Sequence, residues 1–236
     1  MGILNLTPDS FWEPSRFNMD ILHSGADIID IGAVSTRPGA EDVPPEEEWR
    51  RLSPVLESIA GSGLRVSIDT TRSETVRRAY SIIGNFIVND ISAGEDDPDM
   101  LETVGGLGLG YVAMHKRGNP RTMDSLCSYN DVVDDVIAYF HEFEDRAAKA
   151  GITDWILDPG FGFSKTVEQN IGMMSRLPDF KALGRPLLVG IADKRFTAGY
   201  TEYWHRKALE GGADILRVHD VAAARRTMEE FEKQHN

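Results

Sequence analysis

The chain has 236 residues, of which 41% are hydrophobic and 27% charged, and its formal net charge is −13. Such an acidic surface repels nucleic acid and anionic lipid, so we expect neither as a partner. The apolar runs are far shorter than the roughly 20 residues of a membrane span, and no basic segment with an apolar core opens the chain, so we expect a cytoplasmic protein.

Eight short apolar runs recur along the chain, and almost every one stops at a polar residue. Continuous stretches of Ile, Val and Leu are typical of parallel strands that are buried on both faces. Polar residues at the carboxyl ends of such strands face the mouth of a barrel, so the pattern indicates a reaction centre at one rim. In chain order, the predicted strands are residues 2–5, 28–30, 66–69, 86–90, 111–115, 155–158, 187–190 and 215–219.

Helical patterns lie between these runs. The segment 44–60, for example, opens with two prolines and three glutamates, which are favoured in the first turn of a helix. Because strand and helix alternate, the sequence predicts an α/β fold: a single (β/α)8 TIM barrel over residues 1–236, with its site at the C-terminal ends of the strands. In chain order, the predicted helices span residues 44–60, 73–82, 97–105, 130–150, 167–177 and 222–234.

Two connections are short for a barrel. Between residues 7 and 27 only about residues 18–23 look helical, which at 1.5 Å per residue spans roughly 9 Å. The stretch 196–212 is similarly short for a rim loop plus a helix. Either these connections carry true deletions, or flexible rim segments of the protein are missing from this sequence.

The segment from Asp158 to Lys165, Asp-Pro-Gly-Phe-Gly-Phe-Ser-Lys, is the sharpest local signal. Proline and alternating glycines after a strand-end acid hold that acid still and let the backbone turn tightly beside a flat ligand. With Asp69 and Asn89 at neighbouring strand ends, the mouth offers acceptors that can read the edge of a heterocycle, because a carboxylate binds two adjacent N–H groups bidentately. Lys194 would then cover the ring carbonyl and an acceptor nitrogen.

Cations and one amide mark other strand ends. Arg37 follows the second strand, and Arg217 and His219 lie at the eighth. Guanidinium groups match phosphate oxygens in a fork, which favours an anion site. Asn5, at the end of the first strand, is either a strand cap or an oxygen ligand for a Mg²⁺ ion that is shared with a phosphate.

Metal hydrolysis is the rival chemistry for a barrel with acids and histidines at its rim. The chain contains no His-x-His or His-Glu-x-x-His spacing, which argues against a zinc hydrolase. Cys127 is the single cysteine, so neither an internal disulfide nor a cysteine-built metal site is available. We interpret it as an ordinary loop residue.

Seven segments, one at nearly every rim position and in order along the chain, carry a family resemblance. They include the opening Gly-Ile-Leu-Asn-Leu-Thr-Pro-Asp-Ser-Phe, the Ser-Thr-Arg-Pro-Gly-Ala run and the Arg-Val-His-Asp-Val run. Together they closely resemble the dihydropteroate synthases, which are pterin-binding TIM barrels. The segments are residues 1–11, 35–40, 67–70, 88–92, 114–120, 157–163 and 217–221.

The resemblance implies a transferase that joins 7,8-dihydropterin-6-ylmethyl diphosphate to 4-aminobenzoate and releases diphosphate, without nucleic acid or membrane partners. It also implies Mg²⁺ as cofactor, with Asn5 as its ligand, a homodimer formed through outer helices, and Asp69, Asp158, Lys194 and Arg217 as the catalytic set. By the family pattern, the pterin is held by Asp69, Asn89, Asp158, Phe163, Gly190 and Lys194, the diphosphate by Asn5, Arg37, Arg217 and His219, and the aminobenzoate by Thr36 and Pro38.

One departure from the family pattern concerns Ala192 and Asp193, which stand where a serine and an arginine usually precede the lysine. An aspartate near the aminobenzoate carboxylate would repel it, so we expect altered binding of sulfonamides, which mimic aminobenzoate. Two alternatives stay open at this point. One is a pterin-binding methyltransferase-like barrel, which would have no use for Arg37, Arg217 and His219. The other is a non-catalytic pterin-binding paralogue.

Overall fold

The computed structural model describes residues 1–6, 19–35, 42–119, 121–192 and 194–235. Its strands coincide with the predicted apolar runs to within a few residues at each end, because each run is long enough only for one buried strand. The strands are β1 (Gly2–Asn5), β2 (Ile29–Gly32), β3 (Val66–Asp69), β4 (Ile87–Asp90), β5 (Gly110–Met114), β6 (Trp155–Asp158), β7 (Leu188–Val189) and β8 (Ile215–Leu216).

The strands close into a ring. Strands β1 to β6 pair in sequence order and in parallel, and β7 pairs in parallel with β8. Two parallel bridges join these sheets, one between Leu157 and Leu187 and one between Gly2 and Val218. The predicted (β/α)8 barrel is therefore confirmed, with β7 and β8 as its thinnest part.

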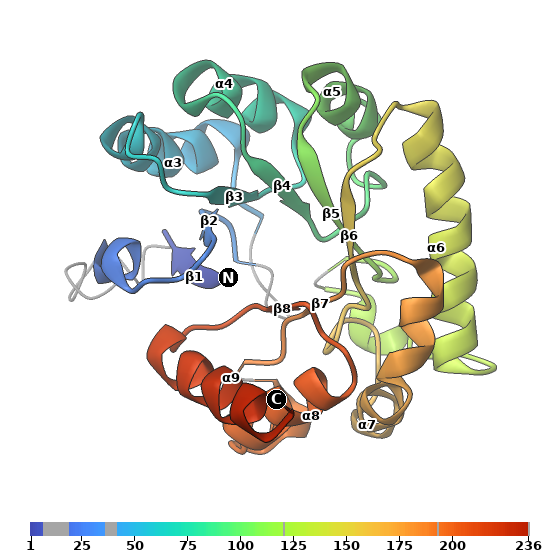
Figure 1. Ribbon diagram of the computed structural model, residues 1–236. Helices are drawn as coiled ribbons and strands as arrows, with labels where there is room; N and C mark the ends of the chain where they lie inside the picture. The colour runs from blue at the N-terminus through green and yellow to red at the C-terminus, as the bar shows by residue number, and fades with distance from the viewer. Residues whose placement is uncertain (7–18, 36–41, 120, 193, 236) are drawn as a thin grey trace.

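Helices surround this ring (Figure 1). The helix predicted for 130–150 is α6, whose N-cap Asp131 accepts from the backbone N–H groups of Val133 and Asp134. The helix predicted for 97–105 begins only at Met100. The helices are α3 (Pro45–Ile59), α4 (Ser73–Ile83), α5 (Met100–Leu107), α6 (Val132–Lys149), α7 (Val167–Ser175), α8 (Thr201–Glu210) and α9 (Val221–His235), with short 3₁₀ turns η1 (Asp20–His23), η2 (Met123–Ser125), η3 (Leu177–Leu183) and η4 (Arg195–Thr197).

The two short crossovers differ from each other. Between β1 and β2, the described residues form only the four-residue turn η1. Between β7 and β8, the chain accommodates a ten-residue helix, α8, within the short stretch 196–212. Within the described residues, no helix is both long and apolar enough to span a membrane.

The main core lies between the strands and the helices. On the side of α6, Phe140 stacks on Trp155 of β6 with ring centroids 6.0 Å apart, and Phe143 meets the same ring edge-on at 5.0 Å. All three side chains are at least 98% buried. Burial of one such aromatic side chain contributes about 2–3 kcal/mol, so this contact fixes α6 against the barrel.

A second, smaller cluster fills the base of the barrel, and it determines where the polar site begins. Side chains two residues apart on a strand share a face, so the residues after this apolar layer also point into the barrel. At each of four strands, a polar side chain stands two residues beyond an apolar one. The pairs are Ile28 and Asp30, Ile87 and Asn89, Ile156 and Asp158, and Ile215 and Arg217. The interior thus changes from apolar to charged within one step along each strand. The apolar layer consists of Met1, Ile28, Ile87, Val112, Ile156 and Leu188, with Ile215 packed against it.

Candidate active site

Arg217, the residue directly after β8, is the centre of one corner of the barrel mouth. Its Nε donates to Oδ2 of Asp30 at 2.7 Å, and its Nη2 donates to Oδ2 of Asp69 at 2.7 Å. Asn89 adds a 3.1 Å hydrogen bond from Nδ2 to the same Asp30 oxygen. The three partners of this network belong to β2, β3 and β4, and Arg217 directly follows β8, so the network connects the two sheets across the interior.

The charges at this corner compensate one another only in part. Burial raises the pKa of Asp69 to about 7, although the Arg217 guanidinium opposes the shift. Burial alone would lower the pKa of Arg217, but Asp30 and Asp69 raise it above its ordinary value. Asp30 is fully buried, and its Oδ1 has no hydrogen-bond partner in the described part of the chain. The Arg217 guanidinium is therefore the shared hydrogen-bond donor and counter-charge of the Asp30 and Asp69 carboxylates.

Asp158, at the end of β6, is held differently. Its Oδ1 accepts from the backbone N–H of Gly160 at 2.8 Å. Burial raises the pKa of Asp158 to about 6, while the Gly160 N–H and the charges of Arg217 and Lys194 oppose the shift. Gly160 has φ +72°, and a Cβ there would lie 1.9 Å from the carbonyl oxygen of His115, so the turn requires glycine.

The predicted pterin residues that follow the sixth and seventh strands lie close together. The ammonium of Lys194 lies 4.3 Å from the ring centroid of Phe163, a cation–π contact. Gly162 has φ +78°, which favours glycine, and a Cβ there would lie 2.7 Å from Cδ of Lys194. Gly190 lies against Arg217, since a Cβ there would be 3.7 Å from the arginine Cβ.

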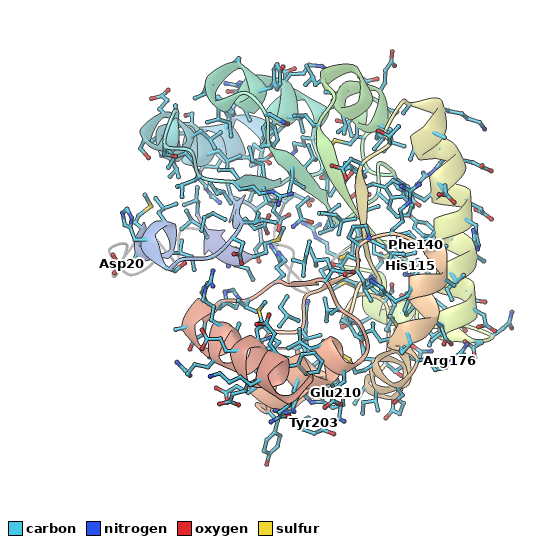
Figure 2. The ribbon with its side chains drawn as sticks, in the orientation of Figure 1. Asp20, His115, Phe140, Arg176, Tyr203 and Glu210 are labelled. Carbon is cyan, nitrogen blue, oxygen red and sulfur yellow. The ribbon has the colours of Figure 1, made fainter. Side chains whose placement is uncertain are left out.

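Two residues of this region were not assigned a role from the sequence. Lys165 is 5% exposed, and its ammonium lies 3.0 Å from Nδ1 of His115. Burial, with the charges of Lys165 and Arg117, lowers the pKa of His115 to about 2, so this imidazole is neutral. His115 lies within the ring of helices, whereas Tyr203 projects outward from α8 (Figure 2). The sequence feature that could have indicated a role for Lys165 is its position at the end of an otherwise largely apolar, glycine-rich segment.

The predicted anion and aminobenzoate residues are only partly described. Asn5 is half-buried at the end of β1 and pairs in register with Gly32, which in turn pairs with Asp69. His219 faces a cavity of about 540 Å³ that Ala192 also lines. Arg217, which we predicted beside the diphosphate, donates hydrogen bonds to Asp30 and Asp69. Thr36, Arg37, Pro38 and Asp193 lie outside the described residues.

This geometry matches known proteins throughout the chain. Residues 1–219 match the model of a family described as pterin binding enzyme. The chain belongs to this family. Among pterin binding enzymes, it is 41% identical to the dihydropteroate synthase of Synechocystis, over 94% of this chain and 85% of that protein.

Solved structures of pterin binding enzymes share the fold. Yersinia pestis dihydropteroate synthase in a sulfonamide drug complex superposes with a TM-score of 0.92 at 32% identity, covering 100% of this chain and 93% of that one. The Thermus thermophilus dihydropteroate synthase in complex with 4-aminobenzoate gives a TM-score of 0.87 at 39% identity, with 99% and 93% covered. The family resemblance seen in the sequence is thus confirmed.

Within the pterin binding enzyme fold, the described residues provide three carboxylates (Asp30, Asp69 and Asp158), an amide and two cations around one mouth. Carboxylates with raised pKa values bind N–H donors in either protonation state near neutrality. The cations keep the acids partly ionised and are placed to attract an anionic substrate. The site is therefore suited to a flat, hydrogen-bonding heterocycle that carries an anionic group.

Proposed function

We propose that this protein acts as a dihydropteroate synthase, a transferase of folate biosynthesis that condenses 7,8-dihydropterin-6-ylmethyl diphosphate with 4-aminobenzoate. The observation that carries the proposal is the Asp158 carboxylate, which is 93% buried at the barrel mouth and held by the N–H of Gly160. An acid held in this way suits the N–H edge of a pterin, and the relatives named above carry the same activity.

In the proposed complex, Asp158 accepts the two-donor edge of the pterin, and Asp69 and Asn89 complete the rim of acceptors. Lys194 lies over the ring carbonyl, on the side where it already contacts Phe163. Gly190 leaves room for the ring because it carries no side chain. Asp69 must accept from both the pterin and Arg217, since its Oδ2 already lies 2.7 Å from Nη2 of Arg217.

The reaction breaks the C–O bond between the pterin methylene and diphosphate and forms a C–N bond to the aryl amine, which loses a proton. Positive charge gathers on the pterin as diphosphate leaves, and the fixed Asp158 carboxylate stabilises it. Arg217 and Lys194 contribute cations near the departing anion. The aryl amine attacks as a neutral nucleophile, so Cys127 and the buried serines need no covalent role.

Mg²⁺ belongs to this proposal as a partner of the diphosphate. Magnesium keeps several waters and usually takes only one or two protein ligands plus phosphate oxygens, so a single rim amide such as Asn5 fits that demand. When bound, the ion would stabilise the negative charge on the leaving group. We assign Arg37 and His219 to the diphosphate, and Thr36 and Pro38 to the aminobenzoate.

The alternatives divide on the second substrate. A methyltransferase-like barrel has no use for diphosphate ligands, and a non-catalytic paralogue would bind pterin without turnover; Ala192 and Asp193 are the feature that favours the latter.

We also propose a cytoplasmic homodimer that contacts neither nucleic acid nor membrane. Size-exclusion chromatography with light scattering tests the dimer, and a monomer at micromolar concentration would refute it.

Diphosphate release tests the function. Purified protein with pterin diphosphate, Mg²⁺ and 4-aminobenzoate should release diphosphate at a rate that depends on the amine. Omission of 4-aminobenzoate is the matched control. Pterin binding without amine-dependent release would favour the paralogue and refute the synthase.

A further inference from the structure

The glycine-rich segment after β6 surrounds a buried lysine that no step of the proposed reaction uses. The ammonium of Lys165 lies 3.0 Å from the carbonyl oxygens of Gly160 and Phe163 and 3.0 Å from Nδ1 of His115, with the His115 carbonyl oxygen at 3.5 Å. An ammonium has three N–H donors, so the three closer acceptors use all of them. The side chain is 5% exposed, so these acceptors take the place of water around the ammonium.

Both carbonyls belong to residues that shape the pterin pocket. Gly160 accepts from Lys165 through its carbonyl and donates its N–H to Asp158, so its two peptide groups connect the lysine to the acid. Phe163 accepts through its carbonyl, and its ring lies beneath Lys194. One ammonium thus connects the wall that carries the acid to the wall that carries the aromatic ring.

The third hydrogen bond fastens this segment to the neighbouring strand. His115 follows β5 directly, and its Nδ1 must accept from the Lys165 ammonium, which leaves the proton of the neutral ring on Nε2. The His115 ring also meets Tyr139 of α6 edge-on at 4.9 Å. The acceptors around Lys165 are therefore themselves fixed by the barrel and by α6.

We propose that Lys165 is a positioning residue for the pterin half of the site: it holds residues 158–163 in the binding conformation and so determines affinity for the pterin substrate without touching it. This inference rests on the proposed function. A shift of about 1 Å in a positioned group can cost about 100-fold in rate, so loss of the ammonium is expected to matter although the residue is remote from the reacting bond.

Besides His115, the charged and titratable groups around Lys165 are Asp158 from β6, Arg117 after β5, Cys127, and Lys194 after β7. Burial lowers the pKa of Lys165 to about 7, although the Asp158 charge opposes the shift. In return, the Lys165 charge lowers the pKa of Asp158 against the larger effect of burial. Removal of the ammonium must therefore raise the pKa of Asp158.

The test compares Lys165→Met with Lys116→Met. Lys116 is a matched control because it is also buried, 7% exposed, but its ammonium contacts Asp96 and the carbonyl of Gly118 and not residues 158–163. For Lys165→Met we expect KM for the pterin diphosphate to rise about tenfold or more, with KM for 4-aminobenzoate within about twofold of wild type. The acid limb of its kcat/KM profile should move to higher pH, and Lys116→Met should show neither change.

Equal pterin KM values for the two variants would overturn the proposal, whereas wild-type protein without amine-dependent diphosphate release would refute the proposed function instead. If Lys165→Met fails to fold, hydrogen exchange of the wild-type Gly160 amide replaces it. Between pH 7 and 9, protection of that amide, corrected for intrinsic exchange, should fall as Lys165 loses its proton. Constant protection over this range would also overturn the proposal.

Discussion

Two corners of the barrel mouth hold buried charge in opposite ways. At the corner of β2, β3 and β8, the Arg217 guanidinium is paired with the carboxylates of Asp30 and Asp69. At the corner of β5 and β6, the Asp158 carboxylate is held by a backbone N–H and the Lys165 ammonium by backbone carbonyls.

The difference indicates a division of labour. Arg217 and Asp30 are 187 residues apart in the sequence, at opposite ends of the chain's run of strands. The ion pair between them therefore stabilises the closed barrel, in which the last strand meets the early ones. A carboxylate held by its own turn keeps its remaining acceptor capacity for a ligand. Among the described groups, the N–H of Gly160 is the one hydrogen-bond donor to the Asp158 carboxylate.

Arg217→Met should give the largest effect, on stability. It leaves Asp30 and Asp69 buried without a cation, and breaking such a buried ion pair costs about 3–5 kcal/mol. Arg176→Met is the control, because Arg176 pairs with Asp131, Asp134 and Asp179 on an exposed surface, where a pair contributes at most about 1 kcal/mol. Urea unfolding measures both, and equal losses would remove the distinction between the corners.

Asp158→Asn should instead spare the fold and stop the reaction. The amide cannot supply the negative charge that stabilises the pterin cation, so we expect kcat to fall by about 100- to 1,000-fold or more. The melting temperature and circular dichroism should stay close to wild type, since an amide oxygen can still accept from Gly160. A rate near wild type would show that Asp158 has no electrostatic role.

The pH dependence of stability should differ in sign at two groups of the second corner. The pKa of Asp158 is raised to about 6, so the folded state holds its proton more tightly than the unfolded state, and its contribution is lost as pH rises from about 4 through 6. The pKa of Lys165 is lowered to about 7, so the unfolded state binds more protons between about 7 and 10, and stability rises with pH there.

Unfolding free energies measured across pH check these signs. Relative to Asp158→Asn, wild type should lose stability between pH 4 and 6. Relative to Lys165→Met, it should gain stability between pH 7 and 10. In either pH window, the unfolding free energy of wild type minus that of the variant could stay constant. That result would show that the substituted group has the same pKa in the folded and unfolded states.

The smallest effect is expected at Cys127. Its thiol donates to the backbone carbonyls of Met123 and Asp124, with sulfur–oxygen distances of 3.8 and 3.5 Å. Cys127→Ser keeps the backbone carbonyl that accepts from Gln169 and should change stability by less than about 0.5 kcal/mol and leave turnover intact. Loss of diphosphate release in this variant would point to a covalent role.

The sequence predicts the site best where a single strand determines it. The strands and the polar residue at each strand end follow from short apolar runs, and the i, i+2 rule places Asp158 above Ile156 and Asn89 above Ile87. The pairing of Arg217 with Asp30 does not follow, because it depends on which strands meet when the ring closes. The same holds for Lys165, whose acceptors are backbone carbonyls created by the fold of the glycine turn.

The formation of 7,8-dihydropteroate by wild type and Asp158→Asn, followed by mass spectrometry, tests the central claim most directly. Wild-type protein with both substrates and Mg²⁺ should make product in an amount equal to the diphosphate released, and Asp158→Asn should make at most about one hundredth as much in the same time. No product from wild type, or product from Asp158→Asn at the wild-type rate, would contradict the account.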